Sequence, residues 1–80
     1  MNSTAKKIKN YPAIINLKVD KNSLSADMSD GRSVSIPIAW FPRLSQATQK
    51  ELKYFEISPS GYGIHWPELD EDISVKAFLD

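Results

Sequence analysis

Eighty residues suffice for one hydrophobic core but not two, so the chain is expected to form a single domain. Hydrophobic residues make up 41% and charged residues 25%, which is ordinary for a globular protein and argues against disorder. The absence of cysteine excludes disulfides and thiolate zinc sites. No stretch approaches the roughly 20 apolar residues of a membrane span or the apolar segment of a signal peptide, so we expect a cytoplasmic protein.

The formal net charge is zero, but the charges are segregated along the chain. Residues 1–53 carry nine Lys/Arg and four Asp/Glu, a net charge of +5, whereas residues 54–80 carry one lysine and six acids, a net charge of −5. The two halves either face each other or offer charged surfaces to another macromolecule.

The first half predicts a three-stranded antiparallel meander. Residues 1–12 read as a flexible, basic lead-in, and residues 13–80 as the domain. Polar and apolar residues then alternate over 14–20, 23–29 and 32–36, which predicts three half-buried strands. Their expected buried side chains are Ile15, Leu17 and Val19, then Leu24, Ala26 and Met28, then Val34 and Ile36. The dipeptides Lys21-Asn22 and Asp30-Gly31 are typical of the tight turns between such strands.

The second half predicts short helices and a second hairpin. Pro37 should end the third strand, and residues 38–44 should be irregular or a broken helix because they contain Pro42. Thr48 and Glu51 fit a capping box that starts a helix over about 48–54. Strands over 55–58 and 62–66 flank a turn, and Asp72 or Ser74 should cap a terminal helix. The side chains expected to face the core are Ala47, Leu52, Phe55, Val75, Phe78 and Leu79. The predicted class is α+β, with a three-stranded antiparallel meander, a second β-hairpin and two or three short helices on one side.

Three motifs occur in a fixed order: Asp30-Gly31-Arg32, then Trp-Phe-Pro-Arg-Leu at 40–44, then Gly-Ile-His-Trp-Pro-Glu-Leu-Asp-Glu-Asp-Ile-Ser-Val at 63–75. With these motifs the chain resembles the domain of unknown function 2442 family of small bacterial proteins, over about residues 13–80. The resemblance implies the same α+β arrangement. It also implies a toxin–antitoxin setting, in which this chain looks like the antitoxin half and a domain of unknown function 4160 type protein is its partner.

His65 is the only histidine, and it has a catalytic and a structural interpretation. As a general base it would need a nucleophile or an oriented substrate within hydrogen-bond reach, and the spacing matches no triad signature. The alternative is a partly buried ring bonded to a carbonyl or to a carboxylate such as Asp70 or Asp72. We favour this structural role.

The acids Glu68, Asp70, Glu71 and Asp72 could bind a hard cation, complement a helix dipole, or pair with Arg43 or Arg32. A calcium loop would need a glycine at its turn and a distal glutamate, which are missing here. We therefore expect helix capping or pairing and no metal.

Trp40, Phe41 and Trp66 supply much of the aromatic surface. So small a domain can hardly keep both tryptophans out of its core. We expect Trp66 inside and the edge of Trp40–Phe41 available to a protein partner.

These features favour a non-catalytic protein-interaction module over an enzyme, with no cofactor. The candidate partner-binding residues are Trp40, Phe41, Arg43, His65, Asp70 and Asp72. One alternative is a DNA-binding, autoregulatory protein, although the sparse lysines Lys6, Lys7 and Lys9 and the lack of a helix-turn-helix argue against nucleic acid. A third alternative is a small enzyme that uses His65. Self-association of the chain stays open.

Overall fold

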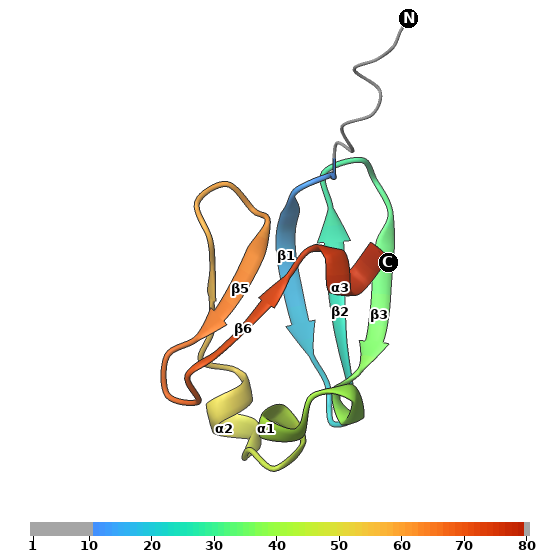
Figure 1. The fold of residues 1–80 in the computed structure, drawn as a ribbon. Coiled ribbons are helices and arrows are strands. Elements are labelled where there is room, and N and C mark those ends of the chain that lie inside the picture. Colours follow the sequence, from blue (N-terminus) through green and yellow to red (C-terminus); the bar gives the residue numbers. More distant parts are fainter. Residues whose placement is uncertain (1–10, 80) are drawn as a thin grey trace, which may run out of the picture.

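The computed structural model describes residues 11–79; residues 1–10 and residue 80 lie outside this range. Residues 11–79 form two three-stranded antiparallel sheets and several short helical segments (Figure 1). The first consists of β1 (Ile14–Val19), β2 (Ser23–Met28) and β3 (Ser33–Pro37), and the second of β4 (Glu56–Ile57), β5 (Gly63–Trp66) and β6 (Glu71–Ser74). The helical segments are η2 (Ile38–Trp40), α1 (Pro42–Ser45), α2 (Gln49–Leu52) and α3 (Lys76–Leu79). The predicted α+β class is confirmed.

The first sheet is the predicted meander, with the strand order β1-β2-β3. The turn after β2 closes with a hydrogen bond from the N–H of Met28 to the carbonyl of Arg32 at 2.8 Å. Gly31 has a φ of +96° in this turn, a conformation that favours glycine, so the turn predicted at Asp30-Gly31 is confirmed. The meander follows directly from the sequence pattern and its turn residues.

One prediction for the first strand is wrong. Ile15 was expected to be buried, but it is 63% exposed, whereas Ile14 is 2% exposed. The register between β1 and β2 shifts between Ile14 and Asn16, as at a β-bulge. An extra residue at a bulge changes which face the neighbouring side chains occupy, so Ile14 takes the inward place. Leu17 is buried as predicted.

The second sheet contains the predicted hairpin, β4 and β5, and a third strand that the sequence analysis did not foresee. Glu71 and Asp72 were expected just ahead of a helix, but both lie in β6, where Ile73 is buried opposite Ile64. The helix begins later, and Ser74 rather than Asp72 supports its start, because the Ser74 hydroxyl accepts a hydrogen bond from the N–H of Lys76 at 3.0 Å.

A single core joins the two sheets, and Trp66 is fully buried in it. The indole Nε1–H of Trp66 donates to the carbonyl of Leu52 at 2.8 Å, which fixes β5 to α2. The predicted capping box of α2 is present, with Thr48 and Glu51 in reciprocal hydrogen bonds. α1 and α2 lie together at one end of the sheets, and α3 packs near β3 and β6 (Figure 1). No helix within residues 11–79 is long and apolar enough to cross a lipid bilayer.

Candidate functional site

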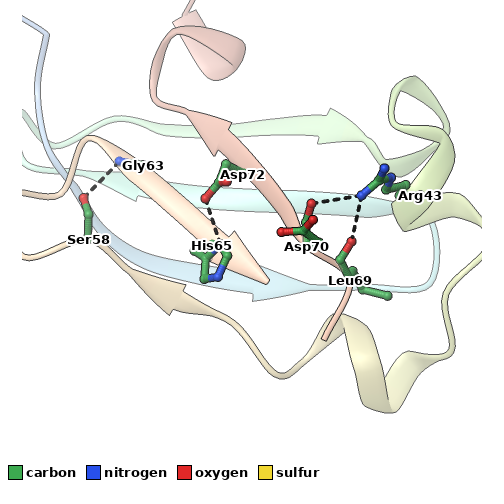
Figure 2. A network of polar contacts seen from close by, with 7 residues as sticks. All are labelled: Arg43, Ser58, Gly63, His65, Leu69, Asp70 and Asp72. Carbon is green, nitrogen blue, oxygen red and sulfur yellow. Dashed lines mark hydrogen bonds and ion pairs between the residues drawn. The ribbon is translucent and has the colours of Figure 1, made fainter. Parts of the chain in front are cut away.

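The outer face of the second sheet carries a row of three polar side chains. Glu56 of β4 pairs with His65 of β5, and His65 pairs with Asp72 of β6. Directly opposed residues in antiparallel strands project from the same face, so these three side chains are neighbours. The Nδ1 atom of His65 lies 2.8 Å from the Oδ1 atom of Asp72 (Figure 2). The prediction that a carboxylate bonds to a partly buried His65 is confirmed.

A shallow hollow of about 490 Å³ opens beside this row. Gly63 lies next to His65 in the lining but contributes no side chain to the hollow. A Cβ atom placed on Gly63 would meet only the carbonyl oxygen of Ile73, at an ordinary 3.5 Å. Ile57, Pro59 and Tyr62 add apolar surface, and the lining includes two carboxylates but neither lysine nor arginine. The lining of the hollow therefore combines apolar residues with two acidic ones.

The serines around the hollow have structural partners. The hydroxyl of Ser58 accepts a hydrogen bond from the N–H of Gly63 at 3.2 Å (Figure 2). The hydroxyl of Ser74 accepts from the start of α3. Within residues 11–79, the ring of His65 has a hydrogen bond only with Asp72, so no hydroxyl is paired with it as a nucleophile would be with its base.

A second exposed feature lies at the end of η2. Trp40 is 62% exposed, whereas Phe41 is partly buried and packs against the core. Pro42 follows at the first position of α1, where its missing N–H costs no hydrogen bond. Trp66 is inside, as predicted; of the Trp40–Phe41 edge that was expected to be available, Trp40 is exposed and Phe41 is partly buried.

Arg43 fixes the turn between β5 and β6 to α1. Its Nη1 atom donates to the carbonyl of Leu69 at 3.2 Å and to the carbonyl of Asp70 at 3.0 Å (Figure 2). The prediction that Arg43 or Arg32 pairs with the carboxylate of Asp70 or Asp72 is wrong. Arg43 reaches main-chain oxygens instead, and Arg32 pairs with Asp30 at 2.8 Å in its own turn.

The six residues predicted to bind a partner form two groups rather than one. Arg43 contacts the main chain of Asp70 near the η2–α1 segment that carries Trp40 and Phe41, and His65 bonds to Asp72 on the outer face of the second sheet. Glu56, Tyr62 and Gly63 were not predicted as site residues. The alternation of polar and apolar residues in β4 could have placed Glu56 on the outer face, but its pairing with His65 depends on the register of the hairpin.

Among residues 11–79, no ion pair joins the positively charged half of the chain to the negatively charged half. In the part of the chain that the structure describes, Arg32 forms an ion pair with Asp30 in the first half, and His65 contacts Asp72 in the second half. No group of three or more His, Asp or Glu side chains among residues 11–79 is arranged to hold a metal ion. The acids of the second sheet thus remain available to solvent or to a partner.

A family model described as "Protein of unknown function (DUF2442)" matches residues 14–80. The fold is similar to the crystal structure of a protein of unknown function from Rhodospirillum rubrum ATCC 11170, with a TM-score of 0.77 and 28% identity, covering 88% of this chain and 87% of that chain. It is also similar to the solution NMR structure of an uncharacterized protein from Chromobacterium violaceum, with a TM-score of 0.69 and 23% identity, covering 84% of this chain and 63% of that chain. Among curated proteins, none matches the chain.

Proposed function

The chain belongs to the DUF2442 family of proteins of unknown function, and we propose that it is a non-catalytic protein-interaction module. The observation that carries this proposal is the 62% exposure of Trp40 in a domain whose other tryptophan is fully buried. Tryptophan is enriched among the residues that dominate binding energy at protein interfaces, because its large ring fills a pocket on the partner. An exposed indole on a small domain is suited to that role.

The segment that carries Trp40 is held in place before any partner binds. The N–H of Phe41 donates to the carbonyl of Ile38 at 2.9 Å, and the N–H of Ser45 donates to the carbonyl of Phe41 at 2.9 Å. The Phe41 ring packs against the core, and Arg43 adds its two hydrogen bonds to the β5–β6 turn. Because this backbone is already ordered, binding through Trp40 would lose little conformational entropy.

The partner in this proposal is a small toxin-like protein of the domain of unknown function 4160 type, with the present chain as its antitoxin. This finer assignment is supported by the family resemblance of the motifs at 30–32, 40–44 and 63–75. The chemistry of Trp40 adds one requirement, which is an apolar pocket on the partner that can enclose an indole ring.

Two other functions have less support. A DNA-binding protein would need an element that enters a groove, but the helices among residues 11–79 have at most four residues. An enzyme using His65 would need a hydroxyl or substrate oriented at the imidazole, but among residues 11–79 the ring has a hydrogen bond with the carboxylate of Asp72. A protein-interaction role, in contrast, needs an exposed aromatic side chain, and Trp40 provides one.

Co-expression with the product of the neighbouring gene, followed by size-exclusion chromatography, tests the proposal. We expect a complex that survives His65→Ala and is lost with Trp40→Ala. Tyr54→Ala is the matched control, because Tyr54 is also a large exposed aromatic residue, at 51%, but follows α2 and is not part of the η2–α1 segment. Absence of a complex with the wild-type chain, or a complex that Trp40→Ala leaves intact, would count against the proposal.

A further inference from the structure

We infer that the hollow beside Gly63 receives an arginine side chain of the protein partner. This inference rests on the proposed function and adds a second contact, on the outer face of the second sheet. It follows from three properties of the hollow: its unpaired negative charge, its missing side chain at Gly63 and its exposed aromatic ring.

The charge of the hollow fits a cation. The carboxylate of Glu56 has no hydrogen bond or ion pair with any residue in the range 11–79, and Asp72 is bonded only to His65. Lysine and arginine are missing from the lining, and His65 contacts Asp72 alone, so nothing there offsets the charge of Glu56. Glu56 and Asp72 lie on opposite sides of β5, so their backbones are about 10 Å apart, twice the spacing of neighbouring strands. One cation therefore pairs directly with one of them, and Glu56 is the acid without a partner.

The shape of the hollow fits a long side chain with a flat end. The absence of a side chain at Gly63 leaves space along the outer face of β5 for methylene groups. Pro59 offers an apolar contact for such a stem. Tyr62, which is 64% exposed, and the ring of His65 offer flat faces for stacking.

Arginine fits this set of groups better than lysine does. A guanidinium group is planar, binds a carboxylate through two parallel hydrogen bonds and stacks on aromatic faces. A lysine ammonium is a compact, strongly hydrated charge without these two geometric matches. The proposed contact places the guanidinium at Glu56 and its stem over Gly63.

An NMR titration of the ¹⁵N-labelled chain with N-acetyl-arginine amide tests the site without the partner. We expect saturable shift changes confined to residues 56–58, 62–65 and 72–74. N-acetyl-citrulline amide has nearly the same shape but no charge, and it should bind about fivefold more weakly or worse. N-acetyl-lysine amide should also bind more weakly. Equal binding of the three compounds, or shifts spread over acidic residues outside the hollow, would overturn the inference.

Two variants locate the contact. Gly63→Val should fill the hollow, and its Cβ atom would meet only the carbonyl oxygen of Ile73, at 3.5 Å. Glu56→Gln should remove the charge that pairs with the guanidinium. Each variant should therefore weaken arginine binding by about fivefold. Glu68→Gln is the charge control, because Glu68 is exposed but does not line the hollow. The amide spectrum shows whether each variant keeps its fold, and Gly63→Ala replaces Gly63→Val if it does not. Unchanged binding in folded Gly63 and Glu56 variants would refute the site but leave the complex that depends on Trp40 untouched.

Discussion

Replacing Trp66 by phenylalanine removes the indole N–H that donates to the carbonyl of Leu52 at 2.8 Å. No other hydrogen bond to that buried carbonyl is present among residues 11–79, and leaving such a group unsatisfied costs about 1–3 kcal/mol. The smaller ring also loses packing in a position that is 0% exposed, which adds about 1 kcal/mol. The free energy of unfolding should therefore fall by about 2–4 kcal/mol, against a total of about 4–12 kcal/mol for a domain of this length.

Trp40→Phe is the matched control, because it makes the same chemical change at a site that is 62% exposed. Its effect on the free energy of unfolding should stay within about 0.5 kcal/mol. Urea unfolding followed by circular dichroism measures both variants on one scale. If Trp40→Phe destabilised the domain as much as Trp66→Phe, the reasoning that assigns Trp66 to the core and Trp40 to a partner would be refuted.

Three further predictions concern local features. Gly61→Ala should lower the free energy of unfolding by about 2 kcal/mol or more, because the new Cβ atom would lie 2.7 Å from a neighbouring side chain and the residue has a φ of +78°. The control Gly63→Ala should lower it by less than about 1 kcal/mol. Equal losses of the two variants in urea unfolding would contradict this account. Thr48→Ala should cost about 1 kcal/mol in thermal unfolding, whereas Thr48→Ser, which keeps the capping hydroxyl, should cost little. A hydrogen bond from Ser33 lowers the pKa of Asp27 below its ordinary 3.8. The ionised Asp27 therefore stabilises the folded state fully above pH 3.8, and this stabilisation is lost as the pH falls through the folded-state pKa. An NMR titration of Asp27 should show this low pKa, and Ser33→Ala should raise it. An Asp27 pKa that is the same in the wild-type and Ser33→Ala chains would contradict the role given to Ser33.

Local signals in the sequence predicted much of the fold. The turn at Asp30-Gly31 could be foreseen because few residue pairs adopt its backbone conformation, and the capping box of Thr48 and Glu51 because its hydrogen bonds span only three residues. The burial of Trp66 followed from the size of the chain, which needs a large apolar side chain at its centre. Each of these features depends on neighbours in sequence or on composition.

The features that were missed depend on contacts between distant segments. Ile15 is exposed because the pairing of β1 with β2 contains a bulge, which no alternation within β1 alone reveals. β6 was missed because Glu71 and Asp72 are also typical of the start of a helix. Only their pairing with β5, which the sequence does not show, makes this segment a strand. Arg43 binds carbonyls in a turn 26 and 27 residues away, and an arginine in a sequence does not show which oxygens it will reach.

The candidate site shows the same division. His65 and Asp72 were identified from their residue types, and their bond at 2.8 Å agrees with the structural role assigned to His65. Glu56 and Gly63 were missed because their place in the site depends on the strand register, which pairs Glu56 with His65 and Gly63 with Ser74.

The affinity of the chain for its co-purified partner tests the central proposal most directly. Isothermal titration calorimetry should show that Trp40→Ala weakens binding about 30-fold or more, as expected for an interface residue worth about 2 kcal/mol. The exposed control, Tyr54→Ala, should change the affinity less than about threefold. Equal affinities for wild-type and Trp40→Ala chains would contradict the proposal that this indole anchors a protein partner.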